Sequence, residues 1–342
     1  MAVRKVDIDV FLRERERVPV LDVRSPGEYA EGHLISALSF PLFTDEERKI
    51  IGTLYKQEGK KPAIKKGLDI TGPKMKGFIE EAEALKSETL ALYCWRGGMR
   101  SGSMAWLLDQ YGFNVLLLEG GYKTYRKRIV DFFEQPLPLQ VLTGYTGSKK
   151  THLLHLLGEH GEQIVDIEAL ARHQGSSFGN QKSTSQPTTE QFQNLLFEEF
   201  RKLDLTKPVW VEDENMKIGR VNMPEGLHRQ KNTSPHVFLE IDKGERVAFL
   251  MEDYGNLTVD QLVSATESIS RKLGRQNTDE AIEYIRQGDL GKAAEIILTY
   301  YDARYHKSIS GKKHLIREHV RISMKELKEV PKRLIRKQEH EV

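Results

Sequence analysis

The sequence predicts an α/β protein in which two parallel-sheet domains are followed by a helical region. Three observations lead to this fold class. Short apolar runs alternate with helical patterns over residues 1–133 and again over 134–245, which is typical of parallel sheets with crossover helices. From residue 246 onward the pattern is mainly helical. The 342 residues are also enough for two or three domains of ~100–200 residues each.

The first half contains apolar runs of strand length at residues 18–23 (VPVLDV), 89–94 (TLALYC) and 114–122 (NVLLLEGGY). Residues 101–112 (SGSMAWLLDQYG) predict a helix that begins with serine and ends at glycine. Residues 134–140 (EQPLPLQ) contain two prolines and predict a linker to the second half.

The second half repeats the alternation. Strands are expected at four apolar runs: 139–144, 163–170, 208–214 and 235–242. Helices are expected at 149–161 and 188–203. The polar stretch 172–189 is long for a connecting loop, and such loops usually have a function. From Gly244 the pattern is helical almost to the end.

Composition places the chain among soluble globular proteins, with 39% hydrophobic and 30% charged residues. A single cysteine excludes an intrachain disulfide framework and fits a reducing cytoplasm. A charged N-terminus and the lack of any run of ~20 apolar residues argue against a signal peptide and a membrane span. Net charge is only +2, but residues 55–76 hold seven lysines against two acids, and 301–342 hold 12 Lys/Arg against 6 Asp/Glu. Either region is solvated surface or a site for a polyanion.

The single cysteine, Cys94, ends an apolar run and begins a turn rich in arginine and glycine. A thiol reacts as the thiolate, whose free pKa is ~8.5. Arg96 and Arg100 place cations nearby, and the next helix directs its N-terminal N–H groups at the turn. Gly97 and Gly98 allow backbone N–H groups to turn inward as an anion-binding nest. The pattern indicates a nucleophilic sulfur beside a bound oxyanion.

Two chemistries share this arrangement. Cys94, five intervening residues, Arg100 and Ser101 fit the C-x5-R-S spacing of cysteine-dependent phosphatases. The other is a rhodanese-type loop, in which cysteine carries a transferable sulfur or selenium. Residues 20–42 resemble the rhodanese signature, with Asp22, Arg24, Glu28, Gly32-His33-Leu34 and Ala37. A phosphatase would prefer histidine where Tyr93 stands. The resemblance favours a rhodanese-like domain.

A second motif, TGYTGSKKTHLL at 143–154, follows a strand and begins a helix. Gly144, Lys150 and Thr151 fit the phosphate-binding P-loop pattern G-x-x-x-x-G-K-[ST]. Lys149 departs from it, because glycine is expected there, although Gly147 keeps some backbone freedom. The motif predicts phosphate binding and leaves hydrolysis of a nucleotide open.

Several carboxylates follow predicted strands and could hold Mg²⁺ at their ends. Glu168 follows the run QIVD at 163–166, and Asp213 and Glu214 follow the run PVWV at 208–211. Asp166 and Glu212 are preferred, because each follows its apolar run directly.

Together, the two halves resemble the family of bacterial tRNA 2-selenouridine synthases over nearly the whole chain. The resemblance is carried by an ordered series of segments: LDVRSPGEYAEGHL, FPLFTDEER, LYCWRGGMRS, EGGYKTYR, LTGYTGSKKT, DIEALARHQGSSFG, QPTTEQFQNLL and VWVEDENMKIG. Lys149 and the acidic run EDENMKIG, where a Glu-Ser-Glu-like run is expected, are its departures.

The resemblance implies a rhodanese-like domain at 1–133, a P-loop NTPase-like domain at 134–245 and a basic helical region at 246–342 that contacts tRNA. It implies that wobble 2-thiouridine, in tRNAs of the lysine, glutamate and glutamine types, is alkylated by geranyl diphosphate. The S-geranyl group is then replaced by selenium from selenophosphate. No tightly bound cofactor is expected beyond Mg²⁺, and no membrane or DNA partner.

The resemblance also gives residue roles. Cys94, Arg96 and Arg100 would act in the selenium step, in a loop completed by Trp95, Gly97, Gly98, Met99 and Ser101. The diphosphate would be bound by Gly144, Thr146, Gly147, Ser148, Lys149, Lys150 and Thr151. Asp166 and Glu212 would be the acids that hold Mg²⁺. An apolar slot for the geranyl chain is expected near residues 175–179 or 186–192.

Two other function classes stay open from the residues alone. One is a sulfurtransferase or cysteine-dependent phosphatase with a regulatory P-loop domain, active without tRNA. The other is a non-catalytic RNA-binding protein with vestigial sites, which Lys149 makes conceivable.

Overall fold

The computed structural model describes residues 3–173, 185–255 and 257–340. The chain divides into two compact units, Met1–Phe132 and Phe133–Val342. The division falls within helix α7 (Gly121–Glu134). None of the helices in the described part is long and apolar enough to cross a membrane.

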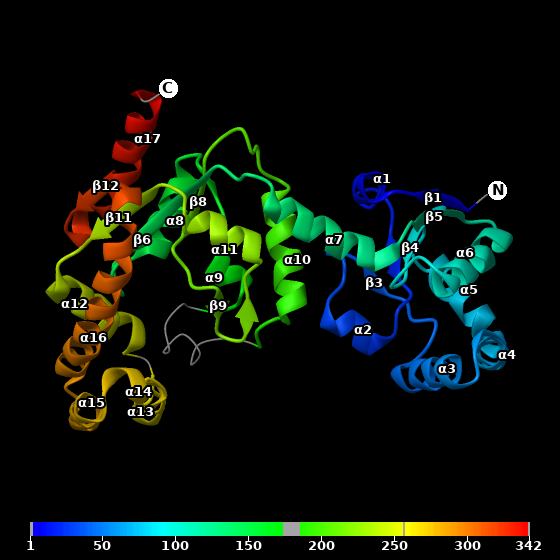
Figure 1. Cartoon of the computed structure of the whole chain (residues 1–342), viewed down its shortest axis with the longest axis horizontal. Helices are drawn as coiled ribbons and strands as arrows, with labels where there is room; N and C mark the ends of the chain where they lie inside the picture. Colours follow the sequence, from blue (N-terminus) through cyan, green and yellow to red (C-terminus); the bar gives the residue numbers. More distant parts are fainter. Residues whose placement is uncertain (1–2, 174–184, 256, 341–342) are drawn as a thin grey trace. The chain divides into compact units, whose positions relative to one another are not determined.

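The first unit is built on a five-stranded parallel sheet in the order β1-β5-β4-β2-β3. Figure 1 labels β1, β5, β4 and β3 of this sheet. Its strands are β1 (Arg4–Val6), β2 (Val20–Asp22), β3 (Leu38–Ser39), β4 (Thr89–Tyr93) and β5 (Asn114–Leu118). Its helices before α7 are α1 (Ile8–Glu14), α2 (Pro26–Glu31), α3 (Asp45–Gln57), α4 (Lys60–Thr71), α5 (Met75–Glu83) and α6 (Met99–Tyr111).

Strand β4 lies inside this sheet, between β5 and β2, and four of its five residues are buried. Leu90 and Leu92, which share one face of the strand, belong to a core cluster with Met104 and Leu108 of α6. Because the strands are parallel, their carboxyl ends meet at one edge. That edge brings together Cys94, the turn after β2 and the Gly120-Gly121 turn after β5.

The basic stretch 55–76 is helical, a feature for which the sequence analysis assigned no element. It covers the end of α3, all of α4 and the start of α5. Most of its lysines are exposed, whereas Lys74 pairs with Glu47 at 2.6 Å. The Thr44–Glu47 capping box fixes where α3 begins.

The second unit contains another five-stranded parallel sheet, in the order β12-β11-β6-β8-β7. Its strands are β6 (Leu139–Gly144), β7 (Gln163–Ile164), β8 (Val209–Glu212), β11 (His236–Glu240) and β12 (Ile316–Arg321). The helices that accompany it are α8 (Lys150–Glu159), α9 (Ile167–Leu170), α10 (Thr189–Phe200), α11 (Glu225–Lys231) and α17 (Val330–His340). A small antiparallel pair, β9 (Lys217–Ile218) and β10 (Val221–Asn222), follows β8.

Two sequence assignments in this unit are corrected. The strand expected over 163–170 ends at Ile164, because Asp166 accepts a hydrogen bond from Ala169 N at 2.8 Å and so caps α9. The C-terminal region expected to be helical contributes β12 to the edge of the sheet. This strand is hidden in the sequence because Arg317, Glu318 and Arg321 interrupt its apolar residues.

The helical part of this unit comprises α12 (Lys243–Tyr254), α13 (Val259–Ser268), α14 (Ser270–Leu273), α15 (Arg275–Gln287) and α16 (Leu290–Lys312). Figure 1 shows α13, α14 and α15 gathered at one end of the long helix α16. They share a separate apolar core that includes Leu262, Ile285 and Ile297. Helix α16 runs from this core to the residues just before β12.

Candidate active sites: a cysteine loop and a phosphate loop

Cys94 lies at the carboxyl end of β4 and is buried, with 3% of its surface exposed. The hydroxyl of Ser101, in the first turns of α6, donates a hydrogen bond to Cys94 Sγ at 3.1 Å. The backbone carbonyls of Cys94 and Trp95 accept hydrogen bonds from Tyr122 N and Lys123 N at 2.8 and 2.9 Å. The start of α7 therefore holds the cysteine loop in place.

Two glycines with positive φ make this close approach possible. Gly97 has φ 62° and Gly121 has φ 62°. A Cβ on Gly121 would lie within 3.0 Å of Cys94 O and Gly97 N, where side-chain carbons essentially never come. The EGGYKTYR segment that carried part of the family resemblance is thus the backbone support of Cys94.

The pKa of the Cys94 thiol is lower than that of an ordinary cysteine. Burial raises it, but the hydroxyl and backbone N–H of Ser101, the backbone N–H of Arg96 and the charge of Arg100 together outweigh burial. The lowered pKa expected from the sequence is therefore present, and Arg96 contributes to it through its main chain.

Arg100, in the first turn of α6, pairs with a carboxylate of the same unit. Its guanidinium forms a two-pronged ion pair with Glu28, in α2, with Nη2 3.2 Å from Oε1. Burial raises the pKa of Glu28, but hydrogen bonds and charge from Arg100 lower it below its usual value. Glu28, part of the rhodanese-like signature, thus holds Arg100 beside the loop.

The side chains of the loop differ in exposure. Arg96 is exposed, Met99 is 51% exposed, Trp95 is half-buried and Ser101 is buried. Gly98 stands just before α6 and has open space around it. The sulfur of Cys94 is therefore buried, while Arg96 and Met99 of the same loop are exposed to solvent.

The phosphate loop runs from Gly144, at the end of β6, to Lys150, at the start of α8. Gly144 has φ 158° and Gly147 has φ 80°. Ser148 is fully buried, and its hydroxyl donates to Tyr145 O at 2.7 Å. Lys150 Nζ donates to Gly144 O and Tyr145 O at 3.1 and 3.4 Å, so its ammonium folds back over the loop.

Lys149 occupies a left-handed backbone position, with φ 56° and ψ 35°. This is a conformation that glycine adopts at little cost and that strains other residues by ~1–2 kcal/mol. Its ammonium lies over the ring of Phe249 in α12, 4.4 Å from the centroid. The lysine therefore keeps the loop's backbone shape and places its charge against α12.

The side chains of Thr151, in α8, and Glu212, at the end of β8, contact each other. The Thr151 hydroxyl donates to Glu212 Oε1 at 3.0 Å. The second oxygen of Glu212, Oε2, is buried without a hydrogen-bond partner. A buried carboxylate oxygen of this kind fits a hard cation, so this pair would hold Mg²⁺.

Other carboxylates surround this pair. Burial, followed by the charges of Glu214 and Glu212, raises the pKa of Glu168 to about 9. Burial raises the pKa of Glu212 to about 7, with Lys150 opposing and the negative charges of Glu214 and Asp166 adding. The side chains of Glu168 and Glu214 hydrogen-bond each other, and burial raises the pKa of Glu214 as well. Both acids were candidates in the sequence, where Asp166 and Glu212 were preferred because each follows its apolar run directly.

Asp166 has a different role in the structure. One oxygen caps α9 and the other lies 2.9 Å from His155 Nε2. Across the described residues, there is no group of three or more His, Cys, Asp or Glu side chains arranged to hold a metal ion. Of the two preferred acids, Glu212 is therefore the one that keeps a buried carboxylate oxygen without a hydrogen-bond partner.

Comparison with known proteins identifies both halves. The profile of the tRNA 2-selenouridine synthase AAA domain matches residues 137–338, and that of the rhodanese-like domain matches 9–128. The tRNA 2-selenouridine synthase of Marinobacter nauticus is 32% identical over 89% of this chain and 91% of the relative. This chain belongs to the tRNA 2-selenouridine synthase family.

Other members of the family give the same result. The tRNA 2-selenouridine synthase of Alcanivorax borkumensis is 32% identical over 89% of this chain and 92% of its own length. That of Nitrosomonas europaea is 38% identical, over 69% of this chain and 63% of its own length. The chain is an enzyme of the tRNA 2-selenouridine synthase kind, with the cysteine loop inside one matched domain and the phosphate loop inside the other.

Helix α16 adds residues to the phosphate site that sequence reasoning missed. Tyr305 hydrogen-bonds Thr143, and its ring centroid lies 5.8 Å from Lys150 Nζ. Asp302 pairs with Arg246 of α12 through two bonds of 2.9 and 2.8 Å. These residues lie more than 150 positions from the loop, and no motif in the family resemblance marks them.

Two segments, 175–179 and 186–192, were expected to lie near an apolar slot for the geranyl chain. Residues 175–179 lie outside the described residues. In 186–192, Gln186 donates to Ala171 O and Ile218 O at 2.9 and 3.2 Å, and Thr188 caps α10. The second segment therefore connects α9, β9 and α10.

Proposed function

We propose that this chain converts 2-thiouridine in tRNA to 2-selenouridine in two steps, each served by one of the two loops. Geranyl diphosphate first alkylates the sulfur, forming a C–S bond and releasing diphosphate. Selenium from selenophosphate then takes the place of sulfur at C2 of the uracil ring: the C2–S bond breaks and geranyl thiol leaves, while hydrolysis of the P–Se bond releases phosphate. Membership in the tRNA 2-selenouridine synthase family, together with one anion-binding loop in each unit, carries the proposal.

The phosphate loop is suited to the first step. Its backbone N–H groups and Lys150 would stabilise the negative charge that grows on diphosphate as the carbon–oxygen bond breaks. Lys150 Nζ now rests on Gly144 O and Tyr145 O, from which a diphosphate oxygen would draw it. Thr151 and Glu212 would hold Mg²⁺, which supplies further positive charge to the leaving group.

The cysteine loop is suited to the second step. A thiolate is the nucleophilic form of cysteine, and the lowered pKa of Cys94 increases its share near neutral pH. Arg96 and Arg100 would bind selenophosphate oxygens, for which the guanidinium fork has matching geometry. Glu28 would keep Arg100 oriented while one edge of that guanidinium contacts the substrate.

The tRNA would bind through the basic surfaces. The lysines of 55–76 and the basic C-terminal helices are the candidates, and affinity should fall as salt rises. Wobble-position targets in tRNAs of the lysine, glutamate and glutamine types, and activity in the cytoplasm, are part of the same proposal.

Nucleoside mass spectrometry tests the proposal directly. Transfer RNA containing 2-thiouridine is incubated with the chain and geranyl diphosphate, and selenophosphate is added afterwards. We expect an S-geranyl adduct that then converts to 2-selenouridine. Turnover of thiosulfate with cyanide, without any modification of tRNA, would instead assign the cysteine loop to simple sulfur transfer.

A further inference from the structure

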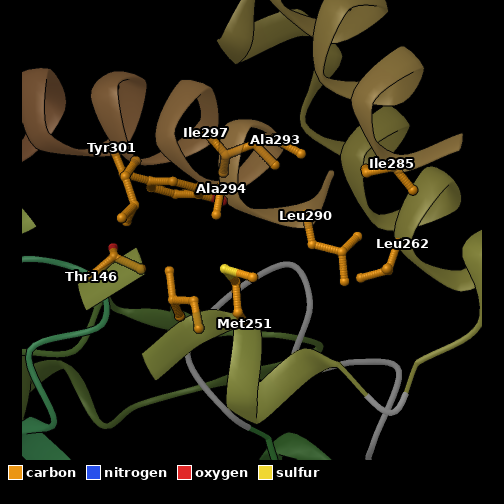
Figure 2. Close-up of a pocket in the computed structure, with 11 residues that line it drawn as sticks. Thr146, Met251, Leu262, Ile285, Leu290, Ala293, Ala294, Ile297 and Tyr301 are labelled. Carbon is orange, nitrogen blue, oxygen red and sulfur yellow. The ribbon is translucent and has the colours of Figure 1, made fainter. Parts of the chain in front are cut away.

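An apolar pocket opens beside the phosphate loop within the second unit (Figure 2). The space between its lining atoms is about 600 Å³, a volume that includes space open to solvent. Residues of α12, α13, α15 and α16 line it, and these are apolar or aromatic. The lining residue from outside these helices is Thr146, in the middle of the phosphate loop.

The pocket has two distinct ends. Figure 2 shows Thr146 and Tyr301 at one end and Leu262, Ile285 and Leu290 at the other. Leu290 and Tyr301 are eleven residues apart on α16, a length of about 16 Å along the helix. The pocket therefore leads from the phosphate loop along α16 into the helical region.

Small side chains on α16 make the space. Ala293 and Ala294 line the middle of the pocket, where neighbouring turns carry Ile297 and Leu290. Protein cores are normally filled to the density of organic crystals, whereas here apolar side chains line a space that is partly open to solvent. Its chemistry suits a hydrocarbon.

The phosphate loop and the pocket walls are joined. Arg246, in α12, donates to Thr146 O at 3.1 Å and pairs with Asp302 of α16. A Cβ on Gly147 would meet the Cβ of Arg246 and Cγ of Leu250 at 3.3 Å. The loop thus packs directly on the helix that forms one wall, so a ligand can occupy both at once.

We propose that this pocket binds the hydrocarbon tail of a prenyl diphosphate whose diphosphate is held by the phosphate loop. The inference rests on the proposed function and adds the place of the tail and the basis of chain-length selection. Thr146 marks where head and tail join, and Leu262, Ile285 and Leu290 form the far end. Affinity should rise with chain length until the tail reaches that end, by roughly fourfold for each buried methylene.

Calorimetric binding to the full chain tests the tail site, with inorganic pyrophosphate, dimethylallyl diphosphate and geranyl diphosphate as probes. Geranyl diphosphate should bind most tightly. Ala294→Phe fills the pocket and should weaken geranyl diphosphate at least tenfold, while pyrophosphate changes less than about twofold, because the loop is untouched. Ala303→Phe makes the same change on an exposed position of α16 and should alter neither.

Equal affinity of Ala294→Phe and the native chain for geranyl diphosphate would overturn the pocket proposal. If the native chain still formed the geranyl adduct on tRNA, the proposed function would stand without it. Tight binding of geranyl diphosphate with no adduct would refute the proposed function and leave the tail site intact.

A second variant covers the case in which Ala294→Phe fails to fold. Leu290→Ala enlarges the far end and should raise the affinity of farnesyl diphosphate relative to geranyl diphosphate by about fivefold or more. An unchanged ratio of the two affinities would contradict the assignment of the far end. General destabilisation of the chain would weaken the binding of both ligands alike and would leave that ratio unchanged.

Discussion

Cys94 shows how neighbouring donors set the acidity of a buried thiol. Burial alone would raise its pKa and keep the sulfur protonated. Hydrogen bonds from Ser101 and from the backbone of Arg96, and the charge of Arg100, reverse that effect. Glu28 forms an ion pair with Arg100 and so keeps the guanidinium near the loop.

The Ser101→Ala variant tests this balance. Removing the hydroxyl removes its hydrogen bond to Sγ, so the pKa of Cys94 should rise. The pH dependence of Cys94 alkylation by iodoacetamide measures it. Reactivity should move to higher pH in the variant, and because Cys94 is the single cysteine, the signal is unambiguous. An unshifted profile would mean that Ser101 does not stabilise the thiolate.

At the scale of single elements, the start of α7 positions the cysteine loop. Its Gly121 lies against the main chain of the loop, and Tyr122 N and Lys123 N donate hydrogen bonds to the loop carbonyls.

In the second unit, Asp213, just after β8, joins three elements. It contacts Lys231 of α11, Lys312 of α16 and Thr143 of β6.

We expect Gly121→Ala to destabilise the first unit by ~2 kcal/mol or more and to impair the selenium step. Its φ of 62° strains a side chain, and the new Cβ would displace the cysteine loop. Urea unfolding and the rate of selenouridine formation measure the two effects. Gly77→Ala, a position in α5 with open space around it, is the control and should not be destabilising.

Asp213→Asn should lower the free energy of unfolding by ~3 kcal/mol, because it leaves Lys231 buried without its countercharge. Burial raises the pKa of Asp213, but Lys231 and Lys312 bring it well below the usual value. The stability that the Asp213 carboxylate contributes is therefore fully present above the pKa of an unfolded aspartate. It declines as pH falls towards the pKa of Asp213 in the folded chain. Urea unfolding measures the free energy of unfolding of the native chain and of Asp213→Asn, and the difference between them should be smaller at acid pH than at neutral pH.

The matched control is Glu199→Gln, which breaks an exposed pair with Lys202 at 2.7 Å. It should change stability by less than ~1 kcal/mol. An Asp213→Asn variant as stable as this control would contradict the role assigned to the buried network.

At the scale of the whole molecule, local patterns predicted the two loops and most strands that carry them. Residues 139–144 form a strand as expected, and Cys94 lies at a strand end as expected. Features that depend on distant residues were missed. Strand β12 is visible only through its pairing with β11. Tyr305 approaches Lys150, and Asp302 pairs with Arg246, only because α16 packs beside the phosphate loop and α12.

Lys149 illustrates the same limit at a single position. The sequence marks it as a departure from glycine, but only the fold shows that it keeps the left-handed backbone and turns its charge towards Phe249. The apolar pocket is a further case, since its lining comes from four helices and one loop. Neither feature has a local sequence signature.

The most direct test of the account is to separate the two steps with two variants, read by nucleoside mass spectrometry. Cys94→Ser should still form S-geranyl-2-thiouridine from geranyl diphosphate but yield no 2-selenouridine. Lys150→Ala should fail to form the adduct yet convert tRNA that already carries it when given selenophosphate. If both folded variants lost both activities, the assignment of one step to each loop would be wrong.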